Sequence, residues 1–260
     1  MQRCFSMRSA AGVLVVFGII CGGFVFAQQP APGQGRGRQS EGQAPGGRAG
    51  GAGQARPGVT AASLVLKVEW VRPPSQTGQV PVVQENIADP NIELKWYGPA
   101  AHQLLTTGTP GSDVTPFGVW SGECTGPYVI TFKQKSNYVD LTGTARIRWA
   151  VKTSGYHEVR PVVKLSDGTL LAGDLTFASV ASLATSEFPL GTIRWIKLDP
   201  ERAVTVSSPG GKNNEIWFQN PDLSKVDEVG FVDLMPSSGH GTGGYSQLAQ
   251  IEVFGKPVPR

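Results

Sequence analysis

Cysteine is scarce in this sequence, and no segment has a long helical pattern. Only three cysteines occur in 260 residues and no two have Cys-x-x-Cys spacing, which argues against a disulfide framework and against a zinc module. No stretch keeps a helical period beyond about two turns. The 34 glycines and 20 prolines interrupt helices further. An all-α protein and a Rossmann enzyme are therefore disfavoured.

Motifs of the common catalytic sites are also missing. Ser237 and Ser238 lie near His240, but no nucleophile elbow surrounds them. The segment GTGGYS at 241–246 lacks the lysine of a phosphate-binding loop. Acidic residues are scattered, and their spacing selects no pair for glycoside hydrolysis. Catalysis therefore has no support in the sequence, and a carbohydrate-active hydrolase or lyase is kept only as an alternative.

The N-terminus has the pattern of an export signal. Arg3 and Arg8 precede an uncharged run at 10–27, and Val25-Phe26-Ala27 suits a signal-peptidase site. Residues 1–27 are therefore predicted to be a signal peptide, with export to the periplasm or the extracellular space. The alternative is an N-terminal membrane anchor, since the run is just long enough to span a bilayer. If the leader is cleaved, we expect no stable membrane span.

The next segment, 28–58, is predicted to be a disordered spacer. It is rich in glycine, proline and arginine and has no aromatic or branched aliphatic residue, so it cannot bury enough apolar area to offset chain entropy. The leader and the spacer together carry a formal charge of +5, whereas the whole chain carries +3, so residues 59–260 carry −2 and are slightly acidic. We therefore expect no nucleic-acid partner for the folded domain.

Residues 59–260 are predicted to form one all-β domain, a two-sheet β-sandwich of the jelly-roll type. Short runs that alternate between apolar and polar residues recur between turn clusters. Ser166-Asp167-Gly168 predicts a tight hairpin, and Asp140-Leu141-Thr142 and Asp222-Leu223-Ser224 predict two equivalent turns before strands. The strand candidates are 64–70, 92–97, 128–133, 145–152, 159–165, 192–198, 226–234 and 247–254.

A basic sheet face is predicted from the turn Thr153-Ser154-Gly155. If the strands on either side of this turn pair, Arg148 lies opposite Arg160, and Tyr156 lies opposite Lys152. Like charges in this position need an anion or interleaved carboxylates. The face is either a platform for a carboxylated or sulfated glycan or a solvated surface with acidic neighbours.

The C-terminal segments NPDLSKVDEVGFVDLM and YSQLAQIEVFGK resemble the last two strands of galactose-binding-like (discoidin-type) β-sandwich modules, and YVDLTGTARIRWAV is similar to their opening strand pair. The resemblance implies a jelly-roll carbohydrate-binding module that binds ligands through loops at one end. It also implies a structural calcium ion, Ca2+, for which Glu252 occupies the place of the family's acidic ligand.

The predicted ligand contacts centre on a glycine-rich loop and one tryptophan. The loop at 236–246 carries Ser238, His240 and Tyr245, whose side chains and neighbouring backbone amides suit sugar hydroxyls and a pyranose face. Trp217 is a candidate stacking platform. The sequence therefore predicts an exported, non-catalytic module that binds a glycan, such as an envelope polysaccharide. A further alternative is a structural envelope protein that binds another protein.

Overall fold

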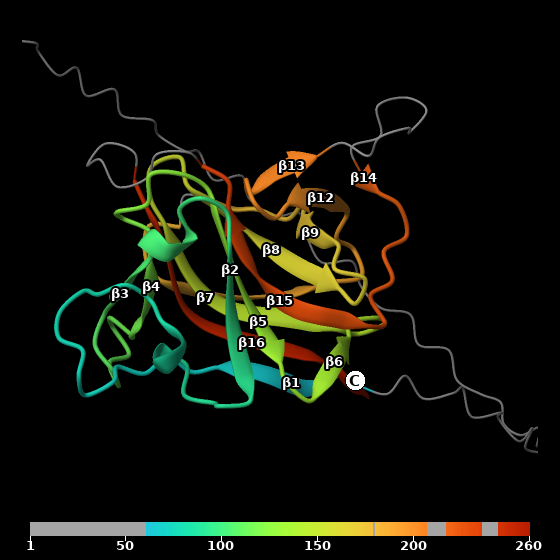
Figure 1. Ribbon diagram of the computed structural model, residues 1–260, viewed down its shortest axis with the longest axis horizontal. Coiled ribbons are helices and arrows are strands. Elements are labelled where there is room, and N and C mark those ends of the chain that lie inside the picture. Colours follow the sequence, from blue (N-terminus) through green and yellow to red (C-terminus); the bar gives the residue numbers. More distant parts are fainter. Residues whose placement is uncertain (1–60, 179, 207–216, 236–243) are drawn as a thin grey trace, which may run out of the picture. The chain divides into compact units, whose positions relative to one another are not determined.

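Almost every regular element of the protein is a β-strand (Figure 1). The computed structural model describes residues 61–178, 180–206, 217–235 and 244–260. Two short 3-10 helices, η1 (Gln84–Asn86) and η2 (Ala101–Gln103), lie among them. The strands are β1 (Ser63–Val68), β2 (Ile92–Tyr97), β3 (Leu105–Thr107), β4 (Gly118–Trp120), β5 (Tyr128–Gln134), β6 (Asn137–Asp140), β7 (Arg146–Thr153), β8 (Glu158–Leu165), β9 (Leu170–Gly173), β10 (Phe177–Ala178), β11 (Ala184–Pro189), β12 (Trp195–Asp199), β13 (Val204–Val206), β14 (Trp217–Phe218), β15 (Val226–Asp233) and β16 (Ser246–Pro259).

The described residues all belong to one of the two compact units of the chain, Ala55–Arg260. The predicted signal peptide at 1–27 and the predicted spacer at 28–58 lie outside the described residues. Both stay predictions, and so does export. Within the described ranges, no helix is long and apolar enough to cross a membrane.

Strand β16 forms the centre of the first sheet. It pairs with β7 along one edge, and β11 pairs with the far edge of β7. Along its other edge β16 pairs first with β4 and then with β1, and β3 continues beyond β4. Leu248 lies opposite Val119 of β4, and Ile251 lies opposite Val68 of β1. Residues 249 and 250 therefore have no paired strand residue on this edge, which leaves a gap in the sheet.

The second sheet has the strand order β2-β5-β15-β8-β9-β12-β13. Strand β14 pairs with β12, and β10 pairs with β8. The end of β16, residues 256–259, pairs with β6, and β6 meets β15 at Val226. Strand β16 thus runs through both sheets and joins them (Figure 1).

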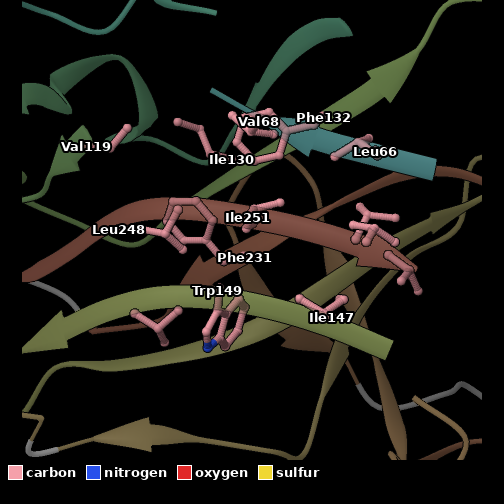
Figure 2. Packing of buried hydrophobic residues seen from close by; sticks show 14 of the residues in the cluster. Leu66, Val68, Val119, Ile130, Phe132, Ile147, Trp149, Phe231, Leu248 and Ile251 are labelled. Atoms are coloured by element: carbon pink, nitrogen blue, oxygen red, sulfur yellow. The ribbon is translucent and has the colours of Figure 1, made fainter. Parts of the chain in front are cut away.

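The main hydrophobic core lies between the two sheets. Ile147, Trp149 and Val151 of β7 are buried there at alternate positions, as their period of two predicts. Figure 2 shows buried side chains from β1, β5, β7, β15 and β16 gathered in one cluster. This packing of two sheets confirms the predicted all-β sandwich and the fold that the resemblance implied.

A second, smaller cluster covers the other face of the second sheet. Val162 belongs to this cluster, whereas its neighbour Val163 belongs to the main core. Both faces of β8 are thus buried at this point, which explains why its apolar residues do not simply alternate. Trp217 and Tyr97 pack against the rim of the second cluster.

Three predicted turns are confirmed. Gly168 has a φ of 89° in the hairpin between β8 and β9, and Asp167 Oδ1 accepts from the backbone N–H of Thr169 at 2.8 Å. The carboxylates of Asp140 and Asp222 each accept from the backbone and the hydroxyl of the residue two positions later. These two turns lie side by side, because Leu141 N donates to Leu223 O at 2.8 Å.

The predicted pairing of Arg148 with Arg160 is wrong. Strands β7 and β8 follow one another in sequence but belong to different sheets. Arg148 lies opposite Glu187 of β11 and Glu252 of β16, and Arg160 lies opposite Val232 of β15. The two guanidinium groups therefore belong to separate sheets and do not form one basic platform.

The physical reason lies in the connection between these strands. Ser154 N donates to Tyr245 O at 2.8 Å, and Tyr245 N donates to Ser154 Oγ at 3.0 Å. His157 is buried in the interior against Asp233. The segment is therefore tied to the start of β16 and to the core and acts as an arch between the sheets. Alternation in the sequence shows which face a residue takes, but it does not identify the partner strand.

Candidate functional site

A pocket beside β12 and β14 contains the predicted ligand residue Trp217; we call it the Trp217 pocket. It encloses about 320 Å3, within the range of small-molecule sites. Its aromatic wall comes from Trp195, Trp217 and Phe218, and its polar groups come from Arg194, Gln219 and Asn220. The pocket thus combines aromatic surface with a few polar groups, which is the usual composition of a ligand site.

Strand pairing positions the two aromatic residues of β14. Trp217 lies opposite Ile196 and Phe218 lies opposite Trp195. Phe218 packs against the main core, whereas Trp217 packs against the second cluster. The two rings therefore point to opposite faces of the sheet, and the indole of Trp217 is left half-buried.

Arg194 is held rigidly against the Trp217 ring. Its guanidinium carbon lies 4.2 Å from the ring centroid, and its Nε donates to Asp174 Oδ2 at 2.8 Å. Asp174 Oδ1 also accepts from the backbone N–H of Arg194 at 3.0 Å. The two terminal nitrogens of this guanidinium make no hydrogen bond with any described residue, and its side chain is 65% exposed. They are therefore available to an oxygen-bearing ligand beside the pocket.

A second group of aromatic residues lies where β4, β7 and β16 meet; we call it the terminal aromatic cluster. The ring centroids of Trp120 and Tyr245 are 6.1 Å apart at an angle of 63°, and Lys152 Nζ lies 5.4 Å from the Tyr245 ring. Gln247 pairs with both Trp120 and Lys152. The structure thus brings the predicted residue Tyr245 together with a tryptophan, an ammonium group and an amide.

Buried hydrogen bonds support this cluster from below. Ser121 and Ser246, which directly follow Trp120 and Tyr245 in the sequence, lie with their hydroxyls 3.0 Å apart. Ser246 N also donates to Ser121 Oγ at 2.8 Å. The Tyr128 hydroxyl lies 2.5 Å from Ser246 Oγ, and burial raises the pKa of Tyr128 well above its usual value.

The same network contains a serine, a histidine and an aspartate, but not in a catalytic order. Asp233 Oδ2 accepts from Ser246 Oγ at 2.6 Å and lies 2.6 Å from His157 Nδ1. The carboxylate thus separates the serine from the histidine, whereas nucleophilic catalysis needs the histidine between the other two. All three side chains are buried. The arrangement is structural.

Glu252 lies in basic surroundings. Its Oε2 accepts from Arg148 at 3.1 Å, and β1 places Lys67 opposite it. Arg148 also contacts Glu187 at 2.7 Å, and this interaction lowers the pKa of the Glu187 carboxyl. Among the described residues, no group of three His, Cys, Asp or Glu side chains is placed to hold a metal ion. Glu252 is paired with Arg148 in this structure, and its role as a calcium ligand stays a prediction.

The remaining predicted ligand residues are dispersed. Arg160 pairs with Glu158 at 3.2 Å on the second sheet, and Tyr156 is 79% exposed on the arch between β7 and β8. Ser238 and His240 lie outside the described residues. Their roles as ligand contacts stay predictions.

Sequence reasoning missed a buried carboxylate on the second sheet. Glu228 accepts from the Tyr97 hydroxyl at 2.9 and 2.8 Å, from Lys164 Nζ at 3.1 Å and from the Thr131 hydroxyl. Burial raises the pKa of Tyr97 to about 12. The sequence offered no distinct signal for Glu228, because the strand candidate 226–234 contains two further acidic residues, Asp227 and Asp233. Because Glu228 is 2% exposed, this group holds strands together and does not contact a ligand.

Cys124 is expected to resist thiol reagents in the folded protein. It is fully buried, its Sγ donates to Ala100 O at 3.6 Å, and burial raises the pKa of the thiol to about 12. Since the thiolate is the reactive form, iodoacetamide at pH 8 should alkylate the Cys124 peptide only after denaturation. Mass spectrometry of digested native and unfolded samples measures this. Rapid alkylation of native Cys124 would contradict the burial.

Comparisons with known proteins give similar solved structures at low identity. No protein-family model matches the chain, and no curated protein is similar to it. It is similar to a family 11 carbohydrate-binding module from Clostridium thermocellum in complex with a β-1,3-1,4-mixed-linked tetrasaccharide. The two chains are 17% identical, the match covers 72% of this chain and 100% of that chain, and the TM-score is 0.40. A family 11 carbohydrate-binding module of a cellulosomal cellulase of Clostridium thermocellum is 15% identical to this chain. That match covers 70% of this chain and 97% of the module, with a TM-score of 0.39. An exo-β-agarase gives 13% identity, 71% and 25% coverage and a TM-score of 0.34.

Proposed function

We propose that this chain is a carbohydrate-binding β-sandwich whose glycan enters the Trp217 pocket. The observation that supports this most directly is the stack of Arg194 on Trp217 beside a pocket of about 320 Å3. The aromatic and apolar walls of the pocket suit the C–H surface of a sugar ring. The guanidinium nitrogens and the amides of Gln219 and Asn220 suit its hydroxyls.

The role we propose is binding without catalysis, in the periplasm or outside the cell. Ser246, Asp233 and His157 are buried, and the aspartate lies between the other two, whereas nucleophilic catalysis needs the histidine in that place. The described residues that line the Trp217 pocket include no carboxylate, whereas glycoside hydrolysis needs two. Export rests on the N-terminal pattern at 1–27. A hydrolase or lyase and a structural envelope protein remain the competing functions.

The Trp217→Ala variant is expected to lose glycan affinity by at least about 30-fold, equivalent to about 2 kcal/mol, because it removes the half-buried aromatic side chain that Arg194 contacts in the pocket wall. Arg194→Ala should weaken binding by a smaller factor. The measurement is a glycan array with neutral, carboxylated and sulfated oligosaccharides, followed by calorimetric titration of each variant with the glycan that binds best.

Two controls separate the possible sites. Arg202→Ala replaces an exposed arginine outside the pocket wall and should leave affinity unchanged. Tyr245→Ala and His240→Ala test the terminal aromatic cluster and the adjoining loop in the same titration. If no glycan on the array binds the native chain, the proposal is wrong. Release of shorter products would favour an enzyme, and co-purification of an envelope protein would favour the structural role.

A further inference from the structure

The gap in the first sheet opens into a groove, which we call the β16 groove. Its floor is formed by Ala249 and Gln250, the two residues of β16 that have no strand partner between β4 and β1. The segment 67–72 forms one wall, and the segment 110–117 contributes to the other. The groove has a volume of about 690 Å3, within the range of ligand sites.

Arg72 fixes the two walls relative to each other. Its guanidinium donates to Gly78 O at 3.0 Å and to Gly108 O at 3.1 Å. The guanidinium carbon also lies 4.8 Å from the centroid of the Phe117 ring, on the opposite wall. Three contacts to separate segments hold the groove in shape before any ligand arrives, which favours binding.

The wall formed by β1 and its extension carries donors that lack acceptors. Trp70 Nε1 and Arg72 Nε are buried, and neither nitrogen has a hydrogen-bond partner among the described residues. Trp70 is 8% exposed. Both nitrogens are shielded from solvent, so the indole N–H of Trp70 reports on this wall and is not itself an exposed ligand contact.

The charges of the groove are balanced. Lys67 pairs with Glu69 at 2.5 Å, and Arg72 and the exposed Asp113 add one charge of each sign. A strongly charged ligand gains little from such walls, and a purely apolar one covers the amide of Gln250 and the carboxylate of Asp113 without offering them hydrogen bonds. The chemistry therefore suits an uncharged ligand rich in hydroxyl and ether oxygens.

We propose that the β16 groove is a second carbohydrate site, which holds a segment of a neutral oligosaccharide by hydrogen bonds, without aromatic stacking. Gln250 contributes its amide from the floor, where both an acceptor and donors are available to sugar hydroxyls. This proposal rests on the proposed function, because it assigns a second contact surface for the same class of ligand.

Indole N–H signals in a 1H–15N spectrum of the full chain report on both sites at once. The Trp70 signal marks the groove and the Trp217 signal marks the pocket, and Trp70→Phe and Trp217→Phe assign them. Cellotetraose, maltotetraose and neoagarotetraose are the neutral probes, and tetragalacturonate is the charged one. We expect a neutral tetrasaccharide to shift the Trp70 signal, and Gln250→Ala to lower the affinity read from it by about three- to tenfold.

Asn137→Ala is the matched control, because it removes a half-buried amide of β6 outside the groove, the Trp217 pocket and the terminal aromatic cluster; it should leave the Trp70 titration unchanged. A shift of the Trp217 signal without a shift of the Trp70 signal overturns the proposal of a second site in the groove, and it leaves the proposed function standing. A shift at Trp70 alone supports the groove proposal and contradicts the proposal that the glycan enters the Trp217 pocket. A Trp70 response to tetragalacturonate only, or one that Gln250→Ala does not weaken, overturns the groove. No shift at either signal overturns both proposals.

Discussion

Replacing Asp233 by alanine is expected to lower the free energy of unfolding by about 3–5 kcal/mol. Asp233 is fully buried, and its two oxygens serve three donors from different parts of the chain. Oδ2 contacts His157 Nδ1 and the Ser246 hydroxyl, each at 2.6 Å, and Oδ1 accepts from Met235 N at 3.0 Å. Removing the carboxylate leaves these groups buried without an acceptor, which is the main cause of the loss.

Urea unfolding of Asp233→Ala, His157→Ala and the double variant measures this effect. Because the two side chains contact each other, the losses should not add, and a coupling of about 1–3 kcal/mol is expected. Asp233→Asn keeps the shape and one acceptor and should lose less than Asp233→Ala. Additive losses, or an Asp233→Ala variant as stable as the native chain, would show that the network contributes little.

Trp149→Ala is expected to destabilise the fold by about 3–5 kcal/mol, because it opens a cavity at the centre of the main core. Trp149 has no exposed surface, and its ring packs against Phe177 at 4.9 Å and Phe188 at 4.8 Å. It lies between the sheets beside Ile147 and Ile251 (Figure 2). Thermal and urea unfolding measure the change.

The control for this variant is Trp149→Phe. The indole Nε1 of Trp149 is buried and has no hydrogen-bond partner among the described residues, so its removal breaks no polar contact. Phenylalanine also keeps much of the ring volume. We therefore expect roughly half the loss of Trp149→Ala. If both variants lose the same amount, the aromatic packing described here does not account for the stability.

Local patterns in the sequence predicted the parts of this fold that depend on near neighbours. Alternation gave β7 and β8 with their buried faces, and Gly168 and the turn aspartates Asp140 and Asp222 marked turns whose hydrogen bonds are local. Steric and hydrogen-bonding preferences within a few residues decide such features. The two-sheet architecture followed from the number and the period of these strands.

Partners distant in sequence could not be predicted in the same way. The pairing of Arg148 with Glu187 and Glu252 depends on which strands adjoin β7, and alternation carries no such information. The Trp217 pocket likewise needs Arg194 and Asp174, which meet only because β12 lies beside β9. Trp217 and Tyr245 were found from residue type, whereas their basic neighbours needed the fold.

The strand that joins the two sheets also sets the order in which the protein is able to fold. Strand β16 is the last described strand to be synthesised, yet it pairs with β1, whose Ser63 lies opposite Gly255. Until β16 is available, β1 has no strand partner and β7 lacks its neighbour opposite β11. Contacts that close such long stretches of chain form slowly. The first sheet therefore cannot be completed until residues 246–259 are available to pair with β1, β4 and β7.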